Sequence, residues 1–368
     1  MHYNQLRGAK LFPAQQALNK TFLAMGGLKL FLPVIMLAVV TACAEKHPGM
    51  HIMTVNGTIP AAELGQTLPH EHVLVDWIGA DSTGYHRWER DSVVSVVLPY
   101  LIEVNKLGVS GFADCSPAYL GRDPLLLKEL SEKSGIHIIT NTGYYGAVNN
   151  RFIPSYAWDE TAEQLAGRWI DEFVNGIDGS GIKPGFIKIG VKEDTLLSGL
   201  HRKLVKAAAL THKETGLVIK SHTGGDAPAF DQIELLLQEG VSPDAFIWTH
   251  AQAGNIASLI EAARMGVWIS LDGVNISGTA EKTGNRDMYV DLILNLKGEG
   301  LLSRVLLSHD AGWYDAGEPA GGGFRAYTDI HQHLIPALEN NGLTPEDIEM
   351  LLSVNPSMAF AIRSVTKD

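Results

Sequence analysis

The chain has 368 residues, of which 45% are hydrophobic and 19% charged, and its formal net charge is −12 with histidine neutral. This composition supports a large buried core and excludes extended disorder. The acidic balance also excludes a nucleic-acid partner, because binding phosphates requires a basic face.

The first 42 residues have the pattern of an export signal. They hold four basic residues and no acidic one, then an apolar run at 30–40 and the sequence Val-Thr-Ala-Cys, which resembles a bacterial lipobox ending at Cys43. We predict a signal peptide over 1–42 and a lipid on Cys43 that anchors the exported chain to a bacterial membrane, facing the periplasm or cell exterior. An uncleaved anchor is the alternative, although a spanning helix needs about 20 apolar residues. Met25 is a second candidate start.

Removing residues 1–42 leaves 25 basic against 41 acidic residues, a net charge of −16. If Cys43 carries lipid, Cys115 has no cysteine left to pair with. Stability must then come from the core rather than from disulfides.

After a linker expected at residues 43–53, residues 54–368 alternate strand-like and helix-like patterns without repeats. Eight apolar runs predict strands: Thr67–Val75, Val109–Cys115, Ile136–Thr142, Phe186–Val191, Leu217–Ser221, Phe246–Thr249, Val267–Leu271 and Val305–Ser308. Helical periodicity lies between them, at Pro124–Lys133, His201–Glu214, Phe230–Glu239, Asn255–Met265 and Arg286–Lys297. Glycine stops follow several of these helices, at 135, 216, 240 and 266. The alternation predicts a single-domain α/β fold, a (β/α)8 TIM barrel, with a doubly wound open sheet as the alternative.

The first strand carries the sequence His70-Glu71-His72. Side chains alternate faces along a strand, so the two imidazoles point the same way and can bind one metal ion, while Glu71 points away.

Further residues of ligand type end later strands. Lys188, His222, His250 and Asp310 stand at or just past the ends of the fourth, fifth, sixth and eighth runs. Catalytic residues of a (β/α)8 barrel gather at this end of the strands. Independent core histidines have no reason to choose this one rim repeatedly, so the joint pattern predicts a metal site.

Several motifs together make the chain resemble the phosphotriesterase family of the amidohydrolase superfamily, from about His51 to Ile362. The motifs are Leu-Pro-His-Glu-His-Val-Leu-Val-Asp at 68–76, Thr-Gly-Tyr-Tyr at 142–145, Gly-Phe-Ile-Lys-Ile at 185–189, Ser-His-Thr at 221–223, Thr-His at 249–250, Leu-Ser-His-Asp at 307–310 and Asn-Pro at 355–356.

The resemblance implies two divalent ions, commonly zinc, with manganese, cobalt or iron as alternatives. It assigns His70, His72 and Asp310 to the buried ion, and His222 and His250 to the exposed one. Lys188 would bridge them as a carbamate made with carbon dioxide, because an ammonium has no lone pair to offer. We prefer Lys188 over two other lysines, 192 and 220, for this role.

The implied mechanism is hydroxide attack, because two metals sharing a water lower its pKa toward neutrality. Asp310 would carry the proton away. A triad of Ser308, His309 and Asp310 is excluded, since contiguous strand residues alternate faces.

Substrate choice depends on the loops. Lactonase members of the family place a tyrosine where Tyr145 stands, although Tyr145 could equally be a buried aromatic residue. Their Leu-Asp-Arg motif is Leu-Asp-Gly here, at 271–273, so an arginine is missing. The glycine-rich loop 312–327 offers Trp313, Tyr314, Phe324 and Arg325 to line a pocket, and Arg325 could replace the lost arginine.

Two other polar residues have two interpretations each. Lys220 should face the same side of its strand as His222, where it either pairs with a carboxylate such as Asp114 or lies deeper as a neutralised charge. Asp272 either orients a ligand histidine or caps its loop.

We therefore predict a binuclear metal-dependent hydrolase that acts on a lactone or carboxylic ester. An organophosphate triesterase is the alternative, and a catalytically idle cell-surface binding protein is the alternative outside enzymes. The resemblance makes a homodimer one expected assembly, because family members often dimerise.

Overall fold

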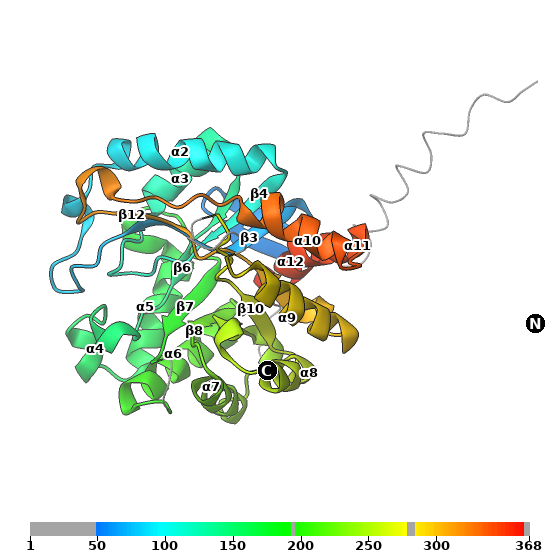
Figure 1. Ribbon diagram of the computed structural model, residues 1–368. Coiled ribbons are helices and arrows are strands. Elements are labelled where there is room, and N and C mark those ends of the chain that lie inside the picture. The colour runs from blue at the N-terminus through cyan, green and yellow to red at the C-terminus, as the bar shows by residue number, and fades with distance from the viewer. Residues whose placement is uncertain (1–48, 193–195, 278–283, 364–368) are drawn as a thin grey trace, which may run out of the picture. The chain divides into compact units, whose positions relative to one another are not determined.

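The computed structural model describes residues 49–192, 196–277 and 284–363 (Figure 1). The predicted signal segment and Cys43 lie outside these residues. Within the described part of the chain, no helix has both the length and the apolar character needed to cross a membrane. The first strand, β1 (His51–Thr54), begins inside the stretch where a linker was expected, and pairs with β2 (Gly57–Pro60) as an antiparallel hairpin.

Parallel strands at the centre follow the predicted runs closely. They are β3 (Gln66–Val75), β4 (Val109–Asp114), β5 (His137–Ile139), β6 (Asn141–Thr142), β7 (Phe186–Gly190), β8 (Ile219–His222), β9 (Phe246–Thr249), β10 (Trp268–Leu271), β11 (Val305–Leu307) and β12 (Gly312–Asp315). The third predicted strand is broken at Thr140 into β5 and β6, and Thr140 O accepts a hydrogen bond from Gly185 N at 2.8 Å. The eighth predicted strand corresponds to β11, and β12 follows β11 after a short turn.

The parallel strands form two hydrogen-bonded sheets, in the orders β11-β10-β9-β8-β7-β6 and β12-β3-β4-β5, and the return of the last strand to β3 closes the barrel. β12 pairs in parallel with β3, with Gly312 opposite His72. Just before β12, Asp310 N donates to His70 O at 3.1 Å, and His72 N donates to Ala311 O at 2.9 Å. The fold is therefore a closed barrel, as predicted, and the open doubly wound sheet is wrong.

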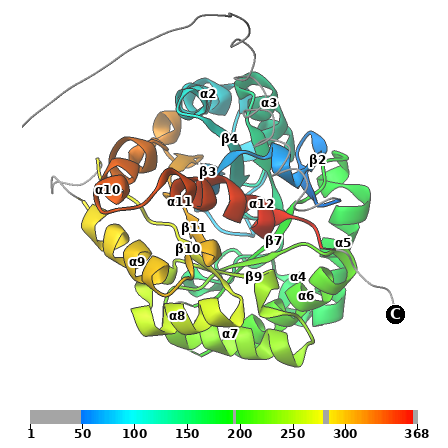
Figure 2. The ribbon, with the colours of Figure 1, turned by 90° about the vertical axis from the view of Figure 1, so that its right-hand side faces the viewer.

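Helices surround the strands, as Figure 2 shows. Their bounds are α2 (Arg90–Lys106), α3 (Pro124–Ser134), α4 (Tyr156–Asp159), α5 (Ala162–Asn175), α6 (Gly199–Thr215), α7 (Asp226–Gln238), α8 (Ile256–Met265), α9 (Arg286–Gly298), α10 (Ile335–Asn340), α11 (Pro345–Glu349) and α12 (Asn355–Phe360). All five predicted helices are present. Helix α7 starts four residues earlier than expected, where Gly225 is the N-cap and Asp226 places a negative charge in the first turn. The four predicted glycine stops all have positive φ.

The end of the barrel at the amino ends of its strands is filled by apolar side chains. Phe186, Ile247 and Leu306 from three strands form one buried cluster with Phe360 of α12. The Phe186 and Phe360 rings pack edge to face at 5.4 Å. Since this end is sealed, the opposite rim is left for polar chemistry.

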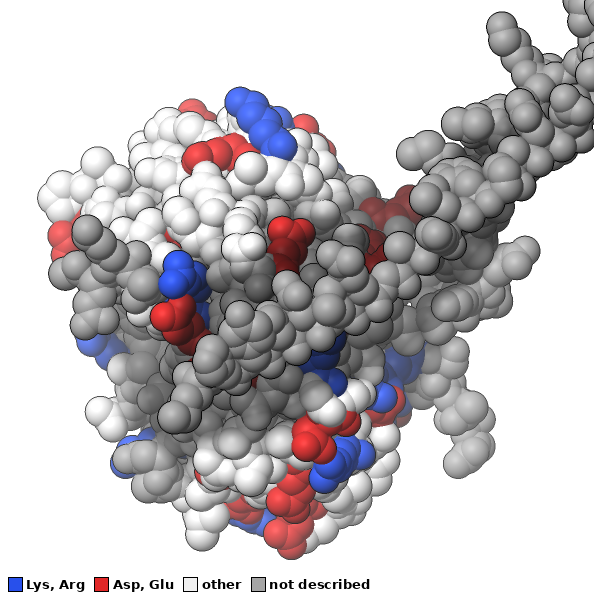
Figure 3. All heavy atoms as spheres, turned by 45° about the vertical axis from the view of Figure 1, so that its right-hand side comes forward, with Lys and Arg blue, Asp and Glu red and all other residues white. Residues whose placement is uncertain are grey.

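Charged side chains on the surface are mixed in sign. On the face drawn in Figure 3, most lysine and arginine side chains have acidic neighbours. On α3, for example, Lys133 Nζ lies 2.6 Å from Glu129 Oε1.

Glu71 joins the two ends of the barrel sheet. Its buried carboxylate accepts from Ser308 Oγ at 2.7 Å, His309 N at 2.9 Å, His309 Nδ1 at 2.7 Å and Ala311 N at 2.8 Å. A single side chain of β3 therefore fixes the whole turn between β11 and β12. The side chain points away from His70 and His72, as expected.

Replacing Glu71 by Gln should destabilise the apo protein by about 3 kcal/mol, because an amide NH2 must then face one of four donors in a dry site. Urea unfolding measures the loss. Glu129→Gln, on the surface of α3, is the matched control and should change stability little. Equal effects of the two changes would contradict this assignment of Glu71.

Candidate metal centre

A small cavity of about 40 Å³ lies at the carboxyl ends of the barrel strands. All six predicted ligands line it, together with Tyr145. The closed barrel brings these six side chains to one rim from five segments, since two of them share β3: His70, His72, Lys188, His222, His250 and Asp310. The other lining residues are Trp77, Cys115, Pro117, Leu120 and Trp313.

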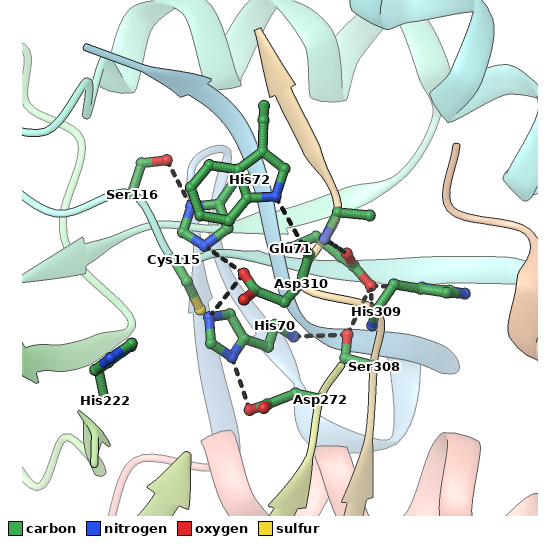
Figure 4. A network of polar contacts seen from close by, with 12 residues as sticks. His70, Glu71, His72, Cys115, Ser116, His222, Asp272, Ser308, His309 and Asp310 are labelled. Carbon is green, nitrogen blue, oxygen red and sulfur yellow. Dashed lines mark hydrogen bonds and ion pairs between the residues drawn. The ribbon is translucent and has the colours of Figure 1, made fainter. Parts of the chain in front are cut away.

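The two histidines of β3 both face Asp310, as Figure 4 shows. Oδ1 of Asp310 lies 3.0 Å from Nε2 of His72 and 3.6 Å from Nε2 of His70. Burial is the main cause that lowers the pKa of both imidazoles, so both are neutral and able to donate a lone pair.

His250 joins this group from β9. One ligand atom each of His70, His250 and Asp310 lies within 4.8 Å of the others, close enough to hold one ion. His250 and Asp310 both have left-handed backbones, with φ of 59° and 52°. Such strained conformations persist only where the surroundings enforce them, and they cluster at functional sites.

His222, at the end of β8, lies on the other side of His250. Its Nδ1 is 2.8 Å from Nε2 of His250 and 3.3 Å from the Tyr145 hydroxyl. Tyr145 is thus both a buried aromatic residue and a polar group at the cavity wall, within reach of a molecule bound at His222.

The head group of Lys188 lacks any hydrogen bond from the described residues, a state that it shares among the predicted ligands with Oδ1 of Asp310. The side chain is 2% exposed and its Nζ is buried without a partner. Burial lowers the pKa of Lys188, which favours the neutral amine. An orphaned amine in a cavity lined by four imidazoles and a carboxylate fits the expected carboxylation, since the product would offer two anionic oxygens to cations.

Asp272 holds two of the imidazoles from behind. Its Oδ2 lies 2.8 Å from Nδ1 of His70, and its Oδ1 lies 2.7 Å from Nδ1 of His250 and accepts from His250 N at 3.0 Å. Burial alone would raise the pKa of Asp272, but the facing His250 and His70 hold it well below the usual value. Of its two interpretations, orienting histidines is confirmed. Because Asp272 accepts hydrogen from Nδ1 of both rings, Nε2 is the atom that each ring turns to the cavity, where Nε2 of His250 lies 2.8 Å from Nδ1 of His222.

His72 is oriented by a residue that sequence reasoning missed. Its Nδ1 lies 3.0 Å from Ser116 Oγ, which itself donates to Leu74 O at 2.7 Å. The available signal was position, because Ser116 follows directly on the second strand at the same rim.

An indole wall covers the His72 side of the cavity. Trp313 lies 4.2 Å from the His72 ring and stacks on Trp77 at 5.4 Å with 13° between the planes. Trp313 is the one member of the candidate loop set that lines the cavity.

Arg325 does not replace the missing arginine. Its Nη2 donates to His309 O, and its backbone pairs with Gly312. Arg325 therefore stabilises the start of β12 and does not line the cavity, and Phe324 packs on Tyr100 at 4.7 Å.

Lys220 does not form an ion pair with Asp114. Its Nζ donates to Ser270 Oγ at 3.2 Å, while Asp114 Oδ1 accepts from Val73 N at 2.8 Å. The excluded triad is also absent as a relay, because Ser308 and His309 both donate to Glu71.

A larger pocket of about 440 Å³ beside α5 is lined by none of the predicted ligands. The hydroxyls of Tyr119 and Tyr144, which line it, each lie 2.7 Å from that of Tyr156. The ligand-type residues therefore assign the chemistry to the smaller cavity.

The phosphotriesterase family model matches residues 50–360 of the chain. The chain belongs to the phosphotriesterase family. This confirms the resemblance and makes the protein a metal-dependent hydrolase of ester bonds.

Individual relatives agree with the family assignment. A phosphotriesterase homology protein of Escherichia coli is 28% identical over 306 residues, which cover 80% of this chain and 98% of the relative. An aryldialkylphosphatase of Saccharolobus solfataricus is 26% identical over 315 residues, covering 83% and 97%. Among solved structures, the organophosphorus hydrolase of Deinococcus radiodurans superimposes with a TM-score of 0.75 at 28% identity, covering 84% of this chain and 97% of that one. A mutant of a PTE-like lactonase from the same organism superimposes with a TM-score of 0.75 at 27% identity. The match covers 84% of this chain and 99% of the mutant.

Burial raises the pKa of Asp114, the last residue of β4, to about 7. The unfolded carboxyl titrates near 4, so between pH 4 and 7 the folded chain binds an extra proton, and stability falls as pH rises through that window. Asp114→Asn stays neutral throughout. Between pH 5 and pH 8, the free energy of unfolding of the apo wild type should therefore fall by about 3 kcal/mol relative to that of the variant.

Urea unfolding at the two pH values measures this difference. Asp91→Asn, an exposed position on α2, should follow wild type. If Asp114→Asn also follows wild type at both pH values, Asp114 is not neutral in the fold.

Proposed function

We propose that the protein is a binuclear hydrolase that opens a lactone or cleaves a carboxylic ester. The single observation that supports this most is the convergence of six ligand-type side chains, with Tyr145, on one small cavity at the barrel rim. The same proposal includes export and a lipid on Cys43.

The residues present fit two divalent ions, with zinc the first choice for imidazole and carboxylate ligands. His70, His72 and Asp310 would hold one ion, His222 and His250 the other, and carboxylated Lys188 both. When bound, the ions supply an ionised water near neutral pH and polarise the substrate carbonyl.

The chain's own residues supply positioning and proton transfer. Asp310 presents one carboxylate oxygen to His72 at 3.0 Å and the other toward His250 at 4.0 Å, so it is placed to take the proton of the attacking water. The Trp77 and Trp313 rings shield the His72 side from bulk water, which strengthens electrostatic interactions inside.

A triester substrate is the second candidate, favoured by relatives named as an aryldialkylphosphatase and an organophosphorus hydrolase. The lactone preference rests on Tyr145, whose hydroxyl is next to His222. At Gly273, a Cβ would lie 2.8 Å from Gln252 Nε2 and from Tyr289 OH, so these two side chains occupy the space beside the missing arginine. The binding contacts of an acyl-homoserine lactone are therefore altered here, and a different lactone or ester is expected.

Substrate class is tested by comparing kcat/KM for simple lactones, aryl esters and dialkyl aryl phosphates with the zinc-loaded protein. We expect lactones or esters to be turned over fastest. Lys188→Met should lower kcat/KM by about a thousandfold or more, because the loss of both ions removes the hydroxide and its electrostatic support. Lys192→Met, at an exposed position nearby, should retain activity. Triester turnover far above lactone turnover would reverse the substrate assignment.

Tyr145→Phe should lower kcat/KM for the preferred lactone about tenfold, the value of one hydrogen bond to the substrate, with zinc content unchanged. Tyr144→Phe is the matched control. Its hydroxyl forms a hydrogen bond with Tyr156 OH at 2.7 Å, outside the cavity of the candidate metal centre, so this change should leave kcat/KM nearly unchanged. Equal effects of the two changes would show that Tyr145 acts only by packing.

A further inference from the structure

Lys220 is a buried charge that the proposed reaction does not use. It is 0% exposed and sits on β8 as the Cα partner of Lys188 on β7. A buried ammonium carries a large desolvation cost unless donors and acceptors around it are satisfied. Lys220 lies two residues before His222 on β8, one layer below the cavity.

A continuous line of hydrogen bonds leads from Lys220 to the site. Lys220 Nζ donates to Ser270 Oγ at 3.2 Å, and Ser270 Oγ donates to Asp272 Oδ2 at 2.7 Å. Ser270 and Asp272 are also 0% exposed, so water does not compete with these contacts.

The chemistry of the three groups fixes the direction of this line. An ammonium only donates, whereas a hydroxyl has one proton and two lone pairs. Lys220 therefore takes a lone pair of Ser270, and the single Ser270 proton is left to point at Asp272. The relay cannot run the other way.

Asp272 connects this chain of hydrogen bonds to one histidine of each predicted ion site. Its Oδ2 is shared between Ser270 and Nδ1 of His70, and its Oδ1 faces Nδ1 of His250. A carboxylate held by these donors cannot rotate, so both histidines keep hydrogen on Nδ1 and present Nε2 to the cavity.

We propose that Lys220 is a positioning residue, which acts through Ser270 and Asp272 to orient His70 and His250 for metal binding. This rests on the proposed binuclear function. Lys220 does not touch substrate and holds no metal. Its effect is on how tightly the two histidines bind ions.

The test is zinc affinity, measured by competition with a chromophoric chelator at fixed bicarbonate. Lys220→Met and Ser270→Ala should each weaken zinc binding about 10–100-fold, the usual effect of losing a partner behind a ligand. Ser270→Thr keeps the hydroxyl and should stay near wild type. The double variant Lys220→Met/Ser270→Ala should bind zinc as tightly as the single variant with the lower zinc affinity. The reason is that both changes break the same chain of hydrogen bonds to Asp272.

Several outcomes overturn the inference. Wild-type zinc affinity in Lys220→Met contradicts it, and so does a double variant whose losses multiply, since Lys220 then acts by another route. If Lys220→Met fails to fold, the contrast between Ser270→Ala and Ser270→Thr decides. The histidine ¹⁵N spectrum gives an independent readout, because loss of the Nδ1–H tautomer in Ser270→Ala is expected only from a positioning role.

A failure of the proposed function can be distinguished from a failure of the role of Lys220. Wild-type protein that binds no zinc would refute the metal centre and this inference together. Wild-type protein that binds two zinc ions, with variants that bind equally well, would refute only the role of Lys220.

Discussion

Hydrogen bonds between the first and last strands of the barrel hold the candidate site together. His70 and Asp310 are far apart in sequence, yet Asp310 N donates to His70 O at 3.1 Å, and Glu71 clamps the turn that carries Asp310. Because Glu71 lies between His70 and His72, strand alternation sends its carboxylate outward and both imidazoles inward. One short motif thus closes the barrel on one face and begins the metal site on the other.

Buried charges in the barrel interior are arranged in layers. The cavity layer contains Asp310 and the amine of Lys188, and Asp272 and Lys220 lie behind it, linked by Ser270. Each charge or amine that is removed from water needs a partner, and the described contacts supply one for Asp272 and Lys220. Lys188 Nζ and Asp310 Oδ1, in the cavity layer, lack a hydrogen bond from the described residues, and bound cations with carboxylation of Lys188 would satisfy both.

The sequence alone predicts the strands and the residues at their ends well, because both follow from local patterns. The eight runs, the inward pair at His70 and His72, and the later residues at one rim all depend on periodicity plus barrel topology. The role of Asp272 also follows from its place at a strand end, although two interpretations were open until its partners were seen.

Contacts between side chains of distant segments could not be predicted. The choice of Ser270 over Asp114 as the partner of Lys220 depends on which inward side chains meet across the barrel, which strand patterns do not specify. Arg325 was one candidate to replace the missing arginine, but the loop after β12 folds back so that Arg325 reaches His309 O. Loop conformation depends on tertiary contacts, and a glycine-rich sequence restricts it least.

Anomalous diffraction from crystals of the zinc-loaded protein would locate the ions directly. We expect two zinc peaks inside the cavity, one against His70, His72 and Asp310 and the other against His222 and His250, with modified Lys188 between them. A single peak, peaks elsewhere, or an unmodified Lys188 with both ions bound would contradict it.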